Sequence, residues 1–412
     1  MPRIAFLAVV VAALVPALVA LPSAQSAAPR RVEGRVVADD TGDPLVNAKV
    51  GFSTTAAAHA TLTDGEGRFA IDTTPGIARL AVTKAGYARR DVALQAGRVV
   101  GDVRLARTAV ITGRISYANG EAAVNVAVSA GVPVPGSQSS FSVRATSVTD
   151  DQGEFRLSGL SEERVVVAAQ VFGARNVMRY FPGVESLSDA ELLDLKAGNE
   201  SDRIDLSLPE SADGSIIVDG GTMFIATPPL RPPGPDEQVT VVRGRVVSAT
   251  GGVVAGALVR LTQQARSGGA TTRSDRDGRF AFADVVPGPF LIGASKNGFS
   301  SEGSPFGRLI TVTATGADAE LTLTPWGSVT GRVVDELGEP VQGAAMQLLR
   351  LQFKDGQRRL VSAFTRTTDD RGVFRIFGVA PGQYILSASA GDVSTAELPG
   401  YTRTFYPGVT DA

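Results

Sequence analysis

The sequence predicts an all-β protein made of several β-sandwich domains in tandem. The first observation is a short segment that recurs in four places, at residues 63–71, 149–157, 274–282 and 368–376. The second is that the stretches between these copies alternate polar with apolar residues and are bounded by Gly or Pro, which is typical of sandwich strands. The third is the length of 412 residues, which suits three or four domains rather than one.

Each copy of this segment, here called the hairpin cassette, places an Asp three residues before a Gly and then alternates polar and apolar side chains. An Asp at the first turn position can accept a hydrogen bond from the backbone two residues on. A Gly at the fourth position can adopt the left-handed conformation that closes a hairpin with a bulge. We therefore predict structural turn residues, and no ligand site, at Asp64, Gly67, Asp150, Gly153, Asp275, Gly278, Asp369 and Gly372.

The composition excludes several function classes. Hydrophobic residues make up 43% and charged residues 20%, which is typical of a globular chain. The formal net charge of -2 gives no electrostatic case for nucleic acid or an anionic membrane as a partner. The arginines are scattered through the predicted strands, which favours a solvated surface. The absence of Cys excludes disulfides, thiolate metal sites, Cys nucleophiles and lipoprotein acylation.

Residues 1–28 have the layout of a secretory signal. Arg3 precedes an apolar run from Ile4 to Ala20, and small residues follow. Ala24 and Ser26 stand at the two positions that a signal peptidase reads, so we predict a signal peptide at residues 1–26 and export to the periplasm, the outer membrane or the medium. A retained membrane anchor is the alternative. No later stretch is apolar enough for a membrane helix, so no integral membrane segment is expected after cleavage.

The cassettes and the strands around them divide the chain into four repeats. We expect sandwich repeats at residues 30–107, 108–209, 239–325 and 326–412, with a Pro-rich linker at residues 210–238. The segment Phe405–Val409 of the fourth repeat aligns with Tyr180–Val184 of the second, which continues for about two further strands from that point. The fourth repeat is therefore apparently truncated. Either the sequence is a fragment, or a neighbouring segment supplies the closing strands.

The repeats resemble the carboxypeptidase regulatory-like domain. The resemblance rests on Gly-Arg-Val, Gly-x-Pro-Val-x-Gly-Ala, Thr-Asp-x-x-Gly-x-Phe-x-Ile and Pro-Gly-x-Tyr, which the fourth repeat carries most fully, at residues 331–333, 338–344, 368–376 and 381–384. It implies tandem transthyretin-like sandwiches of about seven strands, arranged as beads on a string. It also implies an accessory module without catalytic residues, of a kind found in strings on exported bacterial proteins. A carbohydrate ligand is a possibility at the level of the broader fold group.

The residues offer little catalytic chemistry. His59 is the single histidine, whereas a zinc hydrolase needs several ligands and commonly two histidines on one element. The acidic pairs of the cassettes invite a calcium site, but none supplies the six or more oxygens with a bidentate Glu that a calcium loop needs. Trp326, between the third and fourth repeats, favours packing between domains over sugar stacking. We predict no catalytic, cofactor-binding or metal-binding residues and no cofactor.

These observations predict an exported, non-catalytic protein that acts as an interaction or spacer module at the cell envelope. Its expected partners are carbohydrate or envelope proteins, and nucleic acid is not expected. Two alternatives remain open at this point. One is a carbohydrate-binding module, and the other is the N-terminal accessory part of a larger peptidase or outer-membrane transporter.

Overall fold

The computed structural model describes the chain from residue 30 to residue 409 with several gaps. The described ranges are 30–53, 58–73, 77–94, 100–137, 139–171, 177–209, 216–218, 221–223, 229–263, 268–301, 307–354, 356–390 and 401–409. The predicted signal peptide and much of the predicted linker lie outside them.

The prediction of an all-β fold with tandem sandwiches is confirmed. The described strands form separate sheets, and each predicted repeat contains two sheets that enclose a hydrophobic cluster of its own. The apolar residues of each cassette strand supply these clusters, as with Phe155 and Leu157 in repeat 2. The repeat boundaries themselves stay a prediction.

Repeat 1 is a three-stranded sheet facing a four-stranded one. The first sheet has the order β4 (Arg68–Thr73), β1 (Arg30–Ala38) and β7 (Asp102–Leu105). The second has the order β3 (Ala58–Leu62), β2 (Lys49–Ser53), β5 (Arg79–Thr83) and β6 (Arg90–Ala93). The closing strand β7 runs parallel to the opening strand β1.

Repeat 2 has the same plan with more strands. Its first sheet comprises β11 (Glu154–Leu160), β8 (Ala109–Tyr117), β15 (Glu200–Ser201) and β16 (Leu206–Leu208). Its second sheet comprises β10 (Phe141–Val148), β9 (Ala127–Pro133), β12 (Arg164–Val171), β13 (Val177–Tyr180) and β14 (Leu193–Asp194). A 3-10 turn, η1 (Leu187–Asp189), follows β13, and Ser186 caps it because its hydroxyl accepts from the Ser188 N–H.

Repeat 3 is a pair of four-stranded sheets. One has the order β22 (Arg279–Val285), β19 (Thr240–Ser248), β26 (Ala317–Pro325) and β24 (Phe299–Ser301). The other has the order β21 (Gly269–Arg273), β20 (Leu258–Gln263), β23 (Gly288–Ser295) and β25 (Arg308–Val312). Within the predicted linker, β17 (Ile216–Val218) and β18 (Gly221–Met223) pair with each other.

Repeat 4 has one complete sheet and one short sheet. The complete sheet has the order β29 (Gln357–Thr367), β28 (Ala345–Lys354), β31 (Ile385–Ala390) and β32 (Tyr401–Phe405). The other consists of β27 (Gly327–Arg332) and β30 (Val373–Val379). No described strand lies parallel to β27 in the way that β7 lies beside β1.

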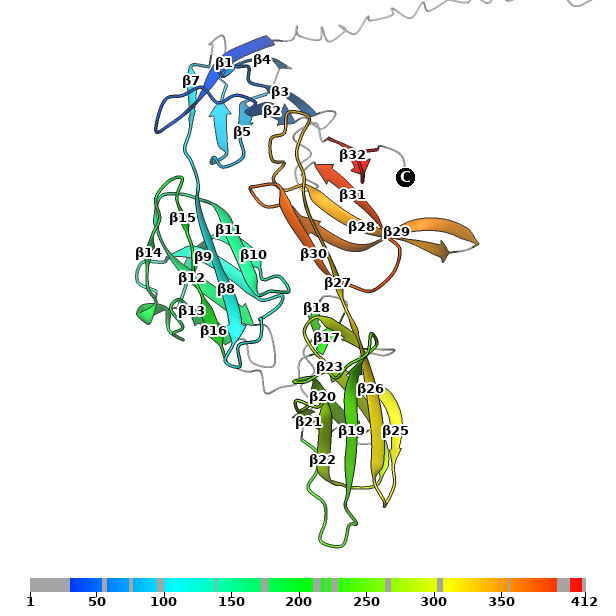
Figure 1. The fold of residues 1–412 in the computed structure, drawn as a ribbon. Helices are drawn as coiled ribbons and strands as arrows, with labels where there is room; N and C mark the ends of the chain where they lie inside the picture. The colour runs from blue at the N-terminus through cyan, green and yellow to red at the C-terminus, as the bar shows by residue number, and fades with distance from the viewer. Residues whose placement is uncertain are drawn as a thin grey trace, which may run out of the picture.

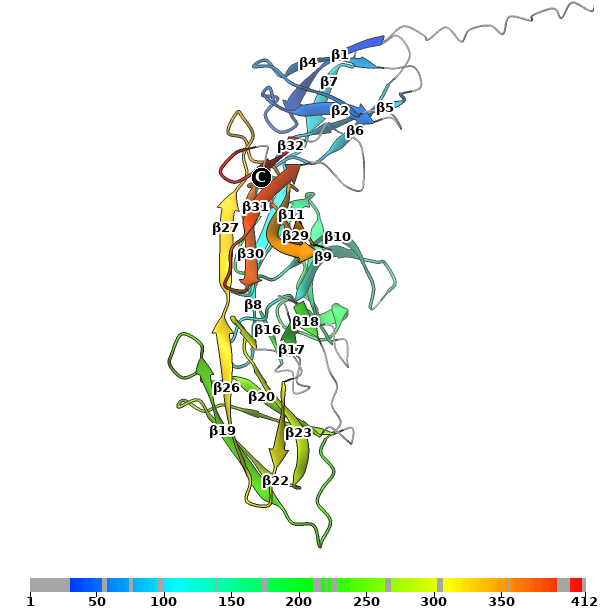
Figure 2. The same ribbon diagram turned by 90° about the vertical axis from the view of Figure 1, so that its right-hand side faces the viewer.

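The repeats do not lie in a simple row. Figure 1 shows repeat 1 at the top, repeat 3 at the bottom, and repeats 2 and 4 beside each other between them. In the view turned by 90°, repeats 2 and 4 overlap, as expected for neighbours at the same height (Figure 2). Arg156 of repeat 2 bonds Asp370 of repeat 4 across 214 positions of sequence, so the chain folds back on itself.

Candidate functional site: an interface between the second and fourth repeats

The cassettes form one turn geometry in all four repeats. In repeat 2, the Gly153 N–H donates to the Asp150 carbonyl at 3.0 Å, and the Asp150 carboxylate accepts the N–H groups of Gln152 and Glu154 at 2.8 and 2.9 Å. The same carboxylate bonds are made by Asp64, Asp275 and Asp369. The four turn glycines have φ values from +72° to +78°, a left-handed region that favours Gly. They are Gly67, Gly153, Gly278 and Gly372. The structure thus places all eight sequence-predicted residues in turns.

The residue that opens each cassette has a structural role that the sequence analysis missed. The buried Thr149 hydroxyl donates to the Ala123 carbonyl and accepts from the Val126 N–H at 2.9 Å, so it ties the cassette to the preceding turn. The same two bonds recur at Thr63, Ser274 and Thr368. The repeated Thr or Ser before the Asp was the signal that could have found it.

The Arg that follows each opening Gly also has a structural role. The Nε of Arg114 donates to the Gln152 carbonyl at 2.9 Å, at the tip of the cassette turn. Matching bonds are made by Arg35, Arg245 and Arg332. Arg114, Arg245 and Arg332 are exposed and Arg35 is half-buried, yet each fixes the turn against the first strand.

Repeats 2 and 4 meet through their cassettes. Arg156 donates from Nε and Nη2 to the carboxylate of Asp370 at 2.7 and 2.9 Å. Arg375 makes the same bidentate contact, donating from Nε and Nη2 to the carboxylate of Asp151 at 2.5 and 2.8 Å. Arg156 and Arg375 occupy the same cassette position, as do Asp151 and Asp370. The contact is therefore reciprocal, like that of a two-fold symmetric dimer, but within one chain.

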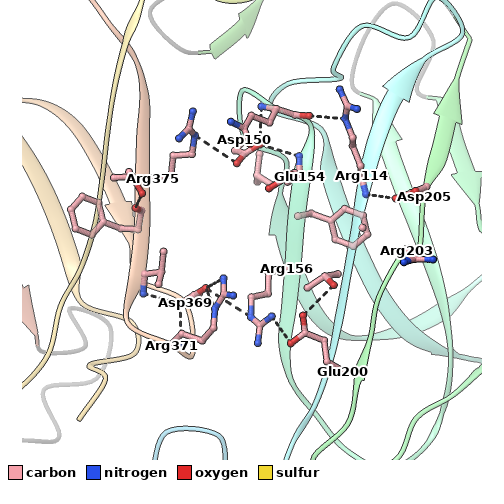
Figure 3. A pocket seen from close by; sticks show the side chains of 18 residues that line it. Arg114, Asp150, Glu154, Arg156, Glu200, Arg203, Asp205, Asp369, Arg371 and Arg375 are labelled. Carbon is pink, nitrogen blue, oxygen red and sulfur yellow. Dashed lines mark hydrogen bonds and ion pairs between the residues drawn. The ribbon is translucent and has the colours of Figure 1, made fainter. Parts of the chain in front are cut away.

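Further acidic groups surround the two bidentate pairs. Glu200 of β15 lies 2.9 Å from the Nη1 of Arg156, and Asp150 lies 3.8 Å from Arg375. Figure 3 shows these side chains converging from the two repeats on a cleft of about 650 Å³. The side chains of Arg156 and Asp370 are only 13% and 11% exposed. The expectation that the arginines form a solvated surface is thus wrong at Arg156, because a neighbouring repeat covers it.

The ionisation of the pairs reflects their surroundings. Partial burial acts to raise the pKa of Asp370, but the hydrogen bonds and positive charge of Arg156 outweigh it and hold that pKa below its ordinary value. The pKa of Arg156 is raised chiefly by its hydrogen bond to Asp370, and that of Arg375 by its bond to Asp151. All these shifts favour the charged state that makes the contact.

The other two cassettes lack the residues that make this contact. Repeat 1 has Gly65 and Ala70 where repeat 2 has Asp151 and Arg156, and repeat 3 has Arg276 and Ala281. The corresponding faces of repeats 1 and 3 are shallow hollows around Gly34 and Gly244. The pattern Asp-Asp-x-Gly-x-Phe-Arg thus marks the two cassettes that dock.

A second set of contacts is reciprocal in the same way, and it joins repeat 1 to repeat 4 and repeat 3 to repeat 2. Glu339 of repeat 4 pairs with Lys84 of repeat 1 at 3.0 Å. Glu121, at the matching turn position of repeat 2, lies 3.6 Å from Arg273 of repeat 3, and the neighbouring Ala122 carbonyl accepts from the Asn297 side chain at 2.7 Å. Repeat 1 thus sits on repeat 4 much as repeat 3 sits on repeat 2.

The other residues singled out from the sequence lie apart from this interface. The exposed His59 stacks on Phe52 of the neighbouring strand, with ring centroids 5.1 Å apart. Trp326 donates its backbone N–H to the Gly298 carbonyl at 2.8 Å, which joins β26 and β27 to the preceding turn. Within the described ranges, no three His, Cys, Asp or Glu side chains form a group suited to a metal ion. A search of the same ranges for a helix long and apolar enough to cross a membrane finds none.

The family model of the carboxypeptidase regulatory-like domain matches residues 31–106, 241–324 and 328–404, more than half of the chain. The chain belongs to the carboxypeptidase regulatory-like domain family. Its carboxypeptidase regulatory-like repeats are a non-catalytic domain type. The model leaves residues 107–240 unmatched, although the sheets of repeat 2 follow the same plan. No curated protein in the comparison matches the chain.

Solved structures offer distant similarities. The Bacillus anthracis TIE protein is 9% identical, with a TM-score of 0.19, covering 72% of this chain and 51% of its own, so the chain spans about half its length. A streptococcal ancillary pilin is 12% identical, with a TM-score of 0.25 and coverage of 68% and 89%. The shaft pilin SpaA from Lactobacillus rhamnosus GG is 14% identical, with a TM-score of 0.24 and coverage of 43% and 95%. At these values the similarities carry no argument about function.

Proposed function

We propose that this chain is an exported, non-catalytic module that sets a fixed spacing between partners at the cell envelope. Membership of a non-catalytic domain family and the repetition of the sandwich support this function. The apolar segment at residues 4–20 and the small residues after it support export. Carbohydrate or envelope proteins remain the expected partners.

The observation that carries the proposal is the reciprocal pairing of Arg156 with Asp370 and Arg375 with Asp151. Beads joined only by linkers would leave the distance between the ends of the chain undefined. Bidentate arginine–carboxylate pairs fix orientation as well as distance, so the folded-back chain holds repeats 1 and 3 at opposite ends of one body (Figure 1).

The spacing function is tested by small-angle X-ray scattering of the full chain and of an Arg156→Asp, Arg375→Asp double variant. Four carboxylates then face one another, and we expect a clear rise in radius of gyration. Adding Asp151→Arg and Asp370→Arg reverses each pair and should restore the compact value. Equal radii for all three proteins, with unchanged circular dichroism, would show that the pairs do not set the shape.

Export is tested separately by fusing residues 1–28 to a reporter without its own signal and fractionating the cells. We expect the reporter outside the cytoplasm, and an Ile4–Ala20 deletion should retain it inside. The assignment as non-catalytic predicts no peptidase turnover. Turnover that a His59→Ala substitution abolishes would contradict it.

A further inference from the structure

The opening strand of every repeat carries the pattern apolar-x-Gly-Arg-apolar, at residues 32–36, 111–115, 242–246 and 329–333. In the first three repeats, a later strand of the same repeat lies parallel beside this strand. These closing strands are β7 beside β1, β15 and β16 beside β8, and β26 beside β19. In repeat 4, β27 pairs with β30 on one edge, and no described strand lies along the other.

The core beneath this edge is correspondingly open. The two apolar residues of the pattern are buried in each closed repeat, as Val32 and Val36, Ile111 and Ile115, and Val242 and Val246. Their counterparts Val329 and Val333 are only half-buried. Apolar side chains that are buried in three repeats are therefore partly exposed to water in the fourth. The hydrophobic effect favours covering them with an added strand.

The glycine of the pattern gives a second, independent measure of how much space lies beside the opening strand. A Cβ atom added to Gly34, Gly113 or Gly244 would meet a backbone carbonyl oxygen of the closing segment at 2.7, 2.2 or 1.9 Å. A Cβ atom on Gly331 would meet the ring of Phe374 at 2.9 Å, and its three nearest atoms all belong to that ring. Apart from its chain neighbours, no backbone atom of the described residues lies closer than 3.9 Å to a Cβ atom added to Gly331, where a closing backbone lies in the other repeats.

The closing strands share a chemistry that defines what would fit there. An acidic residue stands in register with the Arg of the pattern, as Asp102 opposite Arg35 and Glu320 opposite Arg245. In repeat 2, the Asp205 carboxylate accepts the Arg114 N–H at 2.8 Å. The next residue is apolar and lies opposite the second apolar residue of the pattern, and a further apolar residue follows two positions later, at Val103 and Leu105, Leu206 and Leu208, and Leu321 and Leu323.

We propose that the edge of β27 that no described strand covers is a docking site for an extended segment of a separate polypeptide with the pattern acidic-apolar-x-apolar. The segment runs parallel to β27 and places its acidic residue opposite Arg332 and its first apolar residue opposite Val333. Arg332 is exposed, so it supplies the charge complementarity, and the half-buried Val329 and Val333 supply the apolar contact. Binding is by strand addition, in which main-chain hydrogen bonds give affinity and the alternating side chains give specificity.

Such a segment is compatible with the contact between repeats 2 and 4. In repeat 2, the closing strand β15 already lies within that contact, where Glu200 reaches Arg156. Because the contact is reciprocal, the matching place beside β27 lies in an equivalent position next to Arg375.

The proposal is tested with a labelled peptide that copies β26, residues 317–325, added to the full chain. We expect saturable one-to-one binding by fluorescence anisotropy and slower amide hydrogen exchange at residues 327–334. An Arg332→Glu chain should bind about tenfold more weakly, since an attraction becomes a repulsion. A peptide with Glu320→Lys should bind the native chain weakly and regain affinity for the Arg332→Glu chain.

Arg245→Glu is the matched control, because Arg245 makes the same turn bond as Arg332 while its strand edge is covered by β26. It should leave binding unchanged. A peptide with Leu321→Asp and Leu323→Asp should not bind, and this comparison needs no change to the protein if Arg332→Glu fails to fold. The proposal is overturned by absence of saturable binding or by binding indifferent to both charge reversals. Self-association of the peptide-free chain that Arg332→Glu removes would assign the edge to a second copy and overturn the choice of partner.

Discussion

At the scale of single residues, short polar contacts repeat with little variation while their surroundings differ. The cassette Asp binds backbone N–H groups in every repeat, whereas the next position is acidic only in the two repeats that face each other. Asp151 and Asp370 occupy this position. Their neighbours Asp150 and Asp369 are predictable from the turn, but no local pattern reveals a partner more than 200 positions away. The sequence therefore predicts the turn and misses the interface.

The buried hydroxyl of Thr149 provides a stability test. Thr149→Val keeps the shape of the side chain but leaves the Val126 N–H and the Ala123 carbonyl without this partner. We expect a loss of about 1–3 kcal/mol in the free energy of unfolding, measured by urea denaturation. The exposed Thr146 of β10 is the control, and Thr146→Val should change stability by less than about 0.5 kcal/mol. Equal effects of the two substitutions would contradict this role.

The lowered pKa of Asp370 predicts how acid affects the interface. Because the pKa is lower when the pair is formed, the contribution of Asp370 is complete above its ordinary pKa of about 4 and is lost as pH falls through the lowered value. The chain contains no Cys, so Ser161→Cys and Gln383→Cys allow specific labelling of repeats 2 and 4. We expect stable energy transfer between the labels at neutral pH and a loss in acid below about pH 4.

Asp370→Asn is the control for this titration. It should weaken energy transfer already at pH 7 and reduce the amplitude of the acid step. An acid step of unchanged amplitude in Asp370→Asn would show that Asp370 does not govern it.

At the scale of elements, the hairpin turn depends on the close approach of two strands. Gly153 has φ of +78°, and a Cβ atom there would lie 2.3 Å from the Ile115 carbonyl oxygen. The sequence predicts the positive φ, because only Gly closes this turn without strain. It does not predict the approach of β8, since that depends on how the sheet packs.

A pair of Gly→Ala substitutions separates these two effects. Gly120 has φ of +82° but nothing within 4 Å of the added Cβ, so Gly120→Ala should cost only the left-handed strain, about 1–2 kcal/mol. Gly153→Ala adds the clash with β8 and should cost more. Thermal unfolding followed by circular dichroism measures both. A smaller loss for Gly153→Ala than for Gly120→Ala would contradict the close approach.

At the scale of the whole molecule, the chain behaves as two copies of a two-repeat unit that face each other. Repeats 1 and 2 form one unit and repeats 3 and 4 the other, and the central contacts exchange under a two-fold operation (Figure 1). The recurring cassettes are visible in the sequence, but no sequence spacing predicts this pairing. The predicted linker alone would leave repeats 2 and 4 apart, whereas the ion pairs bring repeat 4 back to repeat 2.

The closing strand β15 of repeat 2 makes the two arginines of the interface unequal. Arg156 pairs with Glu200 of β15 in addition to Asp370 and is 13% exposed, whereas Arg375 is 26% exposed. We therefore expect Arg156→Ala to lower energy transfer between labels at Ser161→Cys and Gln383→Cys more than Arg375→Ala does. A Glu200→Gln chain should bring the two effects closer together. A larger loss for Arg375→Ala would contradict the role of β15.

The fold-back also decides how the molecule would carry a mechanical load. A pull applied between repeat 1 and the end of repeat 4 would pass into repeat 4 through the Lys84–Glu339 pair and through the paired cassettes of repeats 2 and 4. Repeat 3 and the connector lie in the bypassed loop between Arg156 and Asp370, which are 214 positions apart. We expect them to bear little tension until those pairs break. The interface would thus carry the load before repeat 3 does, and it would protect repeat 3 from unfolding under tension.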